Sequence, residues 1–217
     1  MINKKLKYLI ILSFFLLPTY NPKVELEFFP IKKIEVSTGK NISKKEITKE
    51  LSILYETNLM ALNIEKINSL MINYELIETA SLKKVYPDKI IIEIKEREII
   101  AIVNNNKDKF FISRDNKLLK FNNDIANDKL PNVFGDYKKF VKFYEDLGFL
   151  NFNLNNIKAY YYFEVGRWDI LTKNKKLIKL PTLDYEKSIT NYLNLDNNLI
   201  KNHSVFDYRI KDQLILK

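Results

Sequence analysis

The sequence contains no cysteine, a single histidine and only 4 glycines among its 217 residues. The absence of cysteine excludes disulfide bonds and cysteine-ligated metals. One histidine cannot build a histidine metal cluster, and no tight spacing of Asp and Glu resembles a calcium loop. Loops that cradle phosphate need glycine for close backbone approach, so the scarcity of glycine argues against them. We therefore predict a protein without a metal or a cofactor.

Apolar residues and positive charge, in contrast, are abundant. Apolar residues make up 46% of the chain, which is enough for a substantial core, and the formal net charge is +9. Such a charge can mark a surface that binds nucleic acid. However, no stretch combines a dense basic run with interleaved aromatic residues, as a platform for stacking bases would. We interpret the lysines as a solvated surface and predict no nucleic-acid partner.

An apolar run follows a group of lysines near the N-terminus. Counted generously over residues 6–20, this segment has about 15 residues, short of the ~20 that span a bilayer. It fits a cleaved signal peptide or a retained anchor, with a buried core helix as a third alternative. No small-residue cleavage signature follows the run, which favours the anchor. The side chains expected in the membrane are Leu9, Ile10, Phe14, Phe15 and Leu17.

The anchor also predicts how the chain is placed. We expect a cytoplasmic tail at residues 1–7, a transmembrane anchor at 8–20 and a polar, proline-punctuated linker at 21–30. Lysines that precede a membrane segment stay cytoplasmic under the positive-inside rule. The rest of the chain is therefore expected to be exported across the membrane. If the segment were a cleaved signal peptide, the same body would be secreted.

The pattern of residues 31–98 predicts the order strand, helix, helix, strand, strand. Ile34 and Val36 alternate with charges, as in a strand with one buried face. Ser43 fits a capping box with Glu46 at the start of the first helix, and Asn63 is a suitable N-cap for the second. The apolar stripes at helical spacing are Ile47, Leu51 and Leu54, then Ile67, Leu70, Met71 and Tyr74.

The stretch SLKKVYPDKIIIEIKERE, residues 81–98, predicts the hairpin that closes this domain. Tyr86–Lys89 is expected to turn the chain because Pro87 presets φ there. The isoleucines that then share one face, under two helices, are Ile90, Ile92 and Ile94. We interpret the charges of residues 95–98 as protection of an exposed strand edge against pairing with other chains.

Residues 99–217 alternate short apolar segments with turn signals. They predict a mainly antiparallel β-domain with one or two helices, and hence an α+β fold for the whole body. One helix is expected over residues 137–147, with Gly148 just past its end. A second helical stripe consists of Tyr185, Ile189, Tyr192 and Leu193. The last segment, residues 205–217, predicts a hairpin.

No group of residues points to catalysis. His203 is not accompanied by a spaced nucleophile and carboxylate, so we interpret it as a polar loop residue. Glu96 and Glu98 could in principle form a glycosidase pair, but the basic residues around them favour a solvated edge. Trp168 and the tyrosines at 160–162 could stack on sugars, yet aromatics at strand spacing more often form core and cross-strand pairs. We predict no catalytic residue and no small-molecule substrate.

Several of these motifs together resemble one protein family. The segment IETASLKKVYPDKIIIEIKEREIIA is similar to the end of the POTRA domain in the FtsQ/DivIB family. The matching positions are Tyr86, Pro87, Glu96, Arg97 and Ala101, while Ile99 stands where the family usually has proline. LPNVFG and GRWDILTKNKKLIKLP resemble later family motifs, with Lys175 in place of a turn glycine, and VFDYRIKDQLILK resembles the closing Asp-x-Arg hairpin. The order and spacing of these motifs extend the resemblance over residues 31–217.

The resemblance implies a non-enzymatic scaffold of the bacterial divisome. Such a protein has one pass through the inner membrane and a periplasmic body, which consists of a POTRA domain, here residues 31–98, and a β-domain, here residues 99–217. It recruits FtsB and FtsL at the division septum and links them to septal cell-wall synthesis. The alternatives are another POTRA-containing assembly or secretion factor, and a periplasmic enzyme acting on glycan. An outer-membrane barrel of many strands does not fit after residue 98.

The last hairpin is the predicted partner surface. The chain ends within its second strand, so we expect either that strand, residues 214–217, or its neighbour, residues 205–210, to present an open edge. FtsB would add a strand there, with main-chain hydrogen bonds supplying affinity and alternate side chains supplying selectivity. The candidate contacts are Tyr208, Ile210, Leu214 and Leu216.

Overall fold

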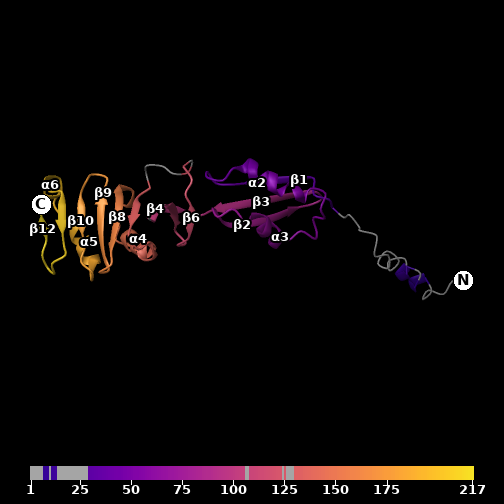
Figure 1. Cartoon of the computed structure of the whole chain (residues 1–217). Coiled ribbons are helices and arrows are strands. Elements are labelled where there is room, and N and C mark those ends of the chain that lie inside the picture. Colours follow the sequence, from indigo (N-terminus) through magenta and orange to yellow (C-terminus); the bar gives the residue numbers. More distant parts are fainter. Residues whose placement is uncertain (1–6, 10, 14–28, 106–107, 124, 126–129) are drawn as a thin grey trace. The chain divides into compact units, whose positions relative to one another are not determined.

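The structure is a computed structural model that describes residues 7–9, 11–13, 29–105, 108–123, 125 and 130–217. The chain divides into two compact units. The first contains the residues up to Asn73 together with Thr79–Lys95, and the second contains Tyr74–Glu78 and Glu96–Lys217. The colours of Figure 1 follow the sequence, so the first unit is drawn in indigo to magenta and the second unit ends in yellow.

Only part of the predicted anchor belongs to the described residues. Residues 7–9 and 11–13 are helical, and their apolar side chains, Leu9 among them, are exposed. The other four predicted membrane residues, Ile10, Phe14, Phe15 and Leu17, lie outside the described residues. Within the described part of the chain, no helix combines the length and the apolar character needed to cross a bilayer.

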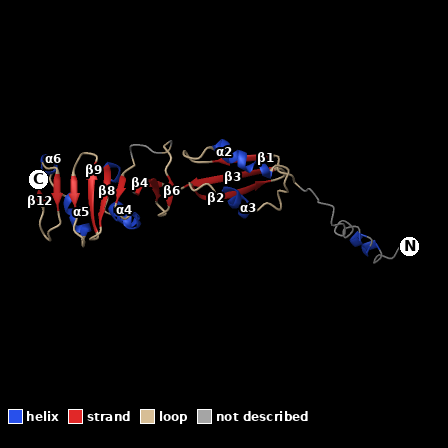
Figure 2. Cartoon of the chain, in the orientation of Figure 1, coloured by secondary structure: helices blue, strands red, loops and turns tan. Residues whose placement is uncertain are grey.

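The first unit has the predicted order of elements. These are β1 (Lys33–Ser37), α2 (Lys44–Glu50), the short 3₁₀ helix η2 (Leu51–Leu54), α3 (Ile64–Met71), β2 (Ile77–Val85) and β3 (Lys89–Glu96). The strands form a three-stranded sheet in the order β1-β3-β2, in which β1 runs parallel to β3 (Figure 2). The fold is therefore the β-α-α-β-β arrangement that the sequence predicts.

The helix starts and the buried faces follow the predicted residues. Ser43 caps α2 by accepting a hydrogen bond from the Glu46 amide at 3.4 Å, and Asn63 caps α3 by accepting from the Lys66 amide at 3.0 Å. Each cap satisfies an amide that has no partner inside its helix. The buried core includes Ile47, Leu51, Leu54, Ile67, Met71, Ile90, Ile92 and Ile94.

The role proposed for the charges of residues 95–98, at the end of β3, is wrong in two respects. β3 is the central strand of its sheet, so its end is not an exposed edge. Arg97 is not solvated either, since its side chain is only 10% exposed and forms an ion pair with Asp115. Its Nε donates to the Glu75 carbonyl at 2.9 Å, and its amide donates to the Leu76 carbonyl at 2.8 Å. Arg97 thus ties residues 74–78 into the second unit.

The second unit is built on one large mixed sheet. Its strands are β4 (Ile99–Asn105), β5 (Asp108–Ser113), β6 (Leu118–Lys120), β7 (Asn132–Phe134), β8 (Ile157–Phe163), β9 (Arg167–Thr172), β10 (Leu177–Lys179), β11 (Val205–Asp207) and β12 (Ile215–Leu216). Their order is β12-β11-β10-β9-β8-β7-β4-β5-β6. Among the described residues, five neighbouring pairs are antiparallel, and the pairs β4–β7, β7–β8 and β10–β11 are parallel. The sheet is mainly antiparallel, as predicted.

Helices occur in the segments that connect the strands of this unit, and three of those in the described residues are α-helices, whereas the sequence predicts one or two. The helices are η3 (Tyr137–Lys139), α4 (Phe140–Phe149), η4 (Leu154–Asn156), α5 (Tyr185–Leu193) and α6 (Asn197–Asn202). The expected end of α4 is wrong, because Gly148 lies inside the helix. The left-handed residue that ends it is Asn151, with φ 58°, after which the Phe152 amide returns to the Leu147 carbonyl at 2.9 Å. Asparagine tolerates this conformation nearly as glycine does.

Aromatic residues dominate the core between sheet and helices. Phe143 of α4 stacks on Trp168 of β9, with ring centroids 4.8 Å apart and planes 3° apart. Tyr160 of β8 is fully buried against Phe140. On the opposite face of the sheet, Tyr161 stacks on Phe134 of β7. The tyrosine run therefore divides between core and cross-strand pairing, which is the distribution predicted for aromatics at strand spacing.

Candidate functional site

The last strand of the second unit, β12, lies at an edge of its sheet. It pairs only with β11, through Phe206 with Leu216 and Asp207 with Ile215, within the described residues. Lys217 and Val205 exchange two hydrogen bonds, at 3.0 and 3.1 Å. Because bonded and non-bonded pairs alternate along an antiparallel ladder, the amide and carbonyl of Leu216 point away from β11. Figure 1 shows β12 at the outer side of the sheet.

The four predicted partner contacts occupy different environments. Ile210 is 51% exposed, on the loop between β11 and β12. Leu214 and Leu216 are partly buried and pack against the core of the second unit. Tyr208 is only 7% exposed, and its hydroxyl donates to Asn191 Oδ1 of α5 at 2.9 Å. The side chain of Ile215, which the sequence did not single out, is exposed on the opposite face of β12.

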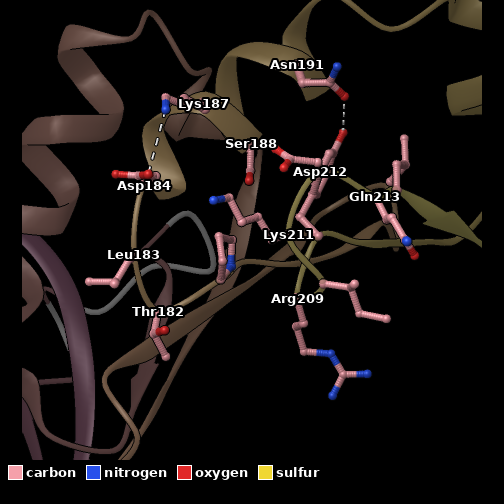
Figure 3. A pocket seen from close by; sticks show the side chains of 14 residues that line it. Thr182, Leu183, Asp184, Lys187, Ser188, Asn191, Arg209, Lys211, Asp212 and Gln213 are labelled. Carbon is pink, nitrogen blue, oxygen red and sulfur yellow. Dashed lines mark hydrogen bonds and ion pairs between the residues drawn. The ribbon is translucent and has the colours of Figure 1, made fainter.

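A hollow of about 670 Å³ lies beside this hairpin. One wall is the loop from Tyr208 to Leu214, and the other is the segment 181–184 with the first turns of α5. Figure 3 shows the side chains that line it, including the hydrogen bond at Asn191 and the ion pair between Asp184 and Lys187. The structure thus brings three of the four predicted residues, Tyr208, Ile210 and Leu214, to one concave surface.

Asp207 and Arg209 fix the start of the loop. Arg209 Nε donates to both oxygens of the Asp207 carboxylate, at 2.8 and 3.0 Å, and Nη2 donates at 2.6 Å. The Arg209 amide donates to the same carboxylate at 3.1 Å. These hydrogen bonds lower the pKa of Asp207 from its ordinary value, although burial acts in the opposite direction. This bidentate pair is the Asp-x-Arg motif of the sequence, and it holds the backbone that leads into the hollow.

A second carboxylate belongs to the same side of the sheet. Asp169 of β9 and Asp207 of β11 are both register partners of Lys179 on β10, so the three side chains share one face. Asp169 is buried and pairs with Arg167 at 3.1 Å. Burial raises the pKa of Asp169, and Arg167 opposes that shift. The charges here are arranged as neutralising rows across strands, which is an arrangement suited to holding strands together rather than to proton transfer.

The other residues weighed for chemistry are engaged elsewhere. Glu98 accepts a hydrogen bond from Arg114 at 3.0 Å, so its carboxylate is paired with a cation. The ring of His203 lies 3.0 Å from the Leu199 carbonyl, just past the end of α6. No group of three or more His, Cys, Asp and Glu side chains placed to hold a metal ion occurs in the part of the chain that the structure describes.

Sequence reasoning missed half of this site. The segment 181–184 and the polar face of α5, with Ser188 and Asn191, carry no apolar pattern that would mark them as a wall. The one signal in the sequence that could have pointed to this site was the Asp-x-Arg motif. Its bidentate pair stiffens the loop that follows it, and that loop forms one wall of the hollow. The two walls are separated in the sequence, so the spacing of residues could not show that they lie side by side in the fold.

Comparisons with known proteins match both units. Residues 29–97 match the family model described as POTRA domain, FtsQ-type. The chain is similar to the cell division protein DivIB of Clostridium tetani, with 29% identity over 82% of this chain and 62% of that protein. It is also similar to the cell division protein FtsQ of Rhizobium meliloti, with 26% identity over 85% of this chain and 62% of that protein. The aligned part thus spans less than two thirds of these relatives.

Among solved structures, the chain resembles the major extracytoplasmic domain of DivIB from Geobacillus stearothermophilus. That likeness covers 45% of this chain and 89% of the other, with 16% identity and a TM-score of 0.35, which is too low to support a conclusion.

Two features define a class of protein, namely the first unit and the sheet of the second unit, which follows it in the sequence and has an open edge at β12. This class is a POTRA module followed by a β-domain, with few helices and a large sheet. Within that class, the predicted resemblance to the FtsQ/DivIB family is confirmed, because residues 29–97 match an FtsQ-type POTRA model and the chain is similar to relatives named FtsQ and DivIB.

Proposed function

We propose that this chain is a non-enzymatic scaffold of the bacterial divisome, anchored in the inner membrane with its body in the periplasm. It recruits FtsB and FtsL and links them to septal cell-wall synthesis. The names of its relatives, which are cell division proteins, support the process in which it acts. The domain limits 31–98 and 99–217 and the anchor at 8–20 are parts of the same proposal.

The observation that carries the proposal is the open edge of β12 beside a shaped hollow. The outward amide and carbonyl of Leu216 offer one ladder position to an added strand. The hollow next to it offers the exposed Ile210 and polar groups of α5 to side chains that continue from that strand. An added strand obtains affinity from main-chain hydrogen bonds, and selectivity from what the hollow admits.

The burial of the candidate contacts separates their roles. Ile210 can contact a partner directly because half of its surface is free. Leu214 and Leu216 act mainly by keeping β12 on the core. Tyr208 supports the hollow through its hydrogen bond to Asn191. We therefore expect charged substitutions at Ile210 to weaken binding without unfolding the protein. Charged substitutions at Leu214 should both weaken binding and destabilise the fold.

Proline at position 216 tests the edge directly. The change Leu216→Pro removes the outward N–H while the inward bonds of Val205 and Lys217 do not involve that amide. Leu216→Ala is the matched control, because it removes the same side chain and keeps the N–H. Binding of a purified FtsB–FtsL complex to the full chain would be measured by titration.

We expect Leu216→Pro to bind about tenfold more weakly than Leu216→Ala, because the partner's carbonyl would be left without its donor. Thermal unfolding would establish that both variants are folded. Equal affinity of the two folded variants would contradict strand addition at this edge. Normal constriction in cells depleted of the protein would contradict the division role itself.

A further inference from the structure

One end of the first unit combines exposed aromatic residues with lysines. The backbone of Phe29–Ile31 bonds to the loop at residues 57–59, through the Ile31 amide with the Thr57 carbonyl at 3.0 Å and the Leu59 amide with the Phe29 carbonyl at 3.0 Å. Lys32 and Lys33 donate their amides to the Asp88 carbonyl in the β2–β3 turn. These segments therefore meet at the end of the sheet where β1 and β3 begin and β2 stops.

Large apolar side chains are exposed at this end. Phe29 and Tyr86 contact each other edge to face, with ring centroids 5.3 Å apart, and each remains more than a third exposed. Met60 is 58% exposed, although its carbonyl accepts a hydrogen bond from the Lys84 ammonium at 2.9 Å. Tyr55 is also exposed nearby, at the C-cap of η2. We call Phe29, Tyr55, Met60 and Tyr86 the aromatic end.

Lysines surround the aromatic end. Lys89 is neutralised by Glu35 at 2.6 Å. Apart from that pair, the segments that form this end carry the lysines Lys32, Lys33, Lys83 and Lys84 against the carboxylates Glu56 and Asp88. The balance is therefore positive. Tyrosine rings next to ammonium groups are the combination that proteins place at the boundary between lipid headgroups and water.

The length of the chain determines what this end can reach. Residues 21–28 separate Phe29 from the proposed anchor at 8–20. Eight residues span at most roughly 28 Å when fully extended. The aromatic end, which contains Phe29 itself, is thus confined close to the bilayer, whereas the linker allows the other end of the sheet to lie farther away by up to the length of β2, roughly 25 Å.

We propose that the aromatic end docks on the surface of the membrane, with aromatic rings and Met60 in the headgroup region and the lysines on anionic headgroups. This inference rests on the proposed anchor. Docking would set the direction in which the first unit leaves the bilayer. Each lysine near an anionic surface contributes to binding, and the contribution is screened by salt.

Single cysteines can report on docking because the natural chain has none. The full chain would be placed in nanodiscs of phosphatidylcholine alone, or with about a third phosphatidylglycerol. An environment-sensitive dye would be attached to Met60→Cys or, as the matched control, to Ile72→Cys. Ile72 is a 79% exposed apolar residue just after α3, near the start of β2 and so at the far end of the same unit.

The dye at position 60 is expected to be protected from an aqueous quencher at least threefold more than the dye at position 72, in anionic nanodiscs. The charge reversal Lys32→Glu with Lys33→Glu should remove most of that protection, since the docking equilibrium falls by roughly tenfold or more. The control Lys44→Glu with Lys45→Glu changes net charge equally at the start of α2, on the far side, and should leave it intact.

The outcomes separate docking from anchoring. If the chain fails to float with the nanodisc lipids, the anchor is wrong and the docking with it. If it floats but the two dyes are quenched equally, the anchor stands and docking is overturned. Equal protection in neutral and anionic nanodiscs would overturn the role of the lysines. Protection at position 60 that appears only after FtsB and FtsL are added would assign this end to a protein partner, and so would overturn docking on lipid.

Discussion

A hydroxyl without a hydrogen-bond partner lies in the core of the second unit. Tyr160 is fully buried, and none of the described residues bonds to its Oη. Burial raises the pKa of this phenol well above its ordinary value, so the group is neutral at pH 7. A buried hydroxyl without a partner loses its hydrogen bonds to water without replacement. The oxygen therefore lowers stability relative to phenylalanine at the same place.

The change Tyr160→Phe should raise the free energy of unfolding by about 1 kcal/mol, because it removes the unsatisfied oxygen and keeps the ring contacts with Phe140 and Phe143. Urea unfolding at pH 7 measures this. Tyr208→Phe is the matched control, since the Tyr208 hydroxyl has a partner in Asn191. That change should lower the free energy by about 1 kcal/mol. Two effects of the same sign would contradict the argument.

Lys175 illustrates what residue identity alone does not predict. It stands where the related motif has a turn glycine, and its φ is 61°, in the region that glycine favours. The Lys175 amide donates to the Thr172 carbonyl at 3.0 Å, and the Lys176 amide donates to Thr172 Oγ1 at 3.0 Å. The turn therefore keeps a left-handed residue without glycine. The sequence showed only the substitution, since the hydrogen bonds that hold the conformation are accepted by Thr172, at the other side of the turn.

At the scale of elements, the loop between β11 and β12 depends on the pair of Asp207 and Arg209. The folded state lowers the pKa of Asp207, so the pair stabilises the protein above the ordinary aspartate pKa of 3.8. That contribution is lost as the pH falls through 3.8 toward the lower folded value. Half of the Arg209 side chain faces solvent, which reduces the value of the pair.

The change Asp207→Asn should therefore lower the free energy of unfolding by about 1 kcal/mol at pH 7, and the difference from the natural chain should shrink below about pH 4. Urea unfolding at a series of pH values measures it. Asp184→Asn is the control at the other wall of the hollow, because Asp184 and Lys187 are 3.7 Å apart and both exposed. It should have little effect at any pH. A difference at position 207 that persists unchanged to pH 3 would contradict the assignment.

The elements that the sequence predicted well are those with local signals. The capping residues Ser43 and Asn63 and the alternation of β3 each need only a few neighbouring residues, and all were found where expected. The placement of β3 in the centre of its sheet was not predictable in that way. It depends on the parallel pairing of β1 with β3, between residues more than 50 positions apart. The parallel pairs β7–β8 and β10–β11 were not predictable from local signals either, since they join segments that are separated along the chain by helices.

Long-range contacts also explain the part of the site that was missed. An open edge was predicted at one of the two strands of the last hairpin, and β12 is the strand at the end of the sheet order. Its neighbouring wall was not, because α5 reaches the hairpin only through tertiary contacts such as Tyr208 with Asn191. The environment of Arg97 was also missed, because a run of charged residues in a sequence suggests exposure to solvent. In the structure, Arg97 donates hydrogen bonds to the carbonyl of Glu75 and the carboxylate of Asp115. Polar residues are interpreted correctly only once their partners are known.

At the scale of the whole molecule, each unit has its own buried residues. Ile92 lies in the centre of the first unit's sheet, and Ile170 occupies the same kind of position in β9 of the second. Both are fully buried. Because the two side chains belong to different compact units, truncating one should affect the contacts of its own unit first.

The change Ile92→Ala should cost about 2–5 kcal/mol and increase amide hydrogen exchange in β1, β2 and α3, while β8 and β9 keep their protection. Ile170→Ala is the matched substitution and should give the reverse pattern, because the cavity it leaves lies among Tyr160, Phe206 and Ile178 on neighbouring strands. Hydrogen exchange followed by mass spectrometry resolves the segments. Loss of protection throughout both units from either change would contradict the expectation that each unit responds first to a cavity in its own core.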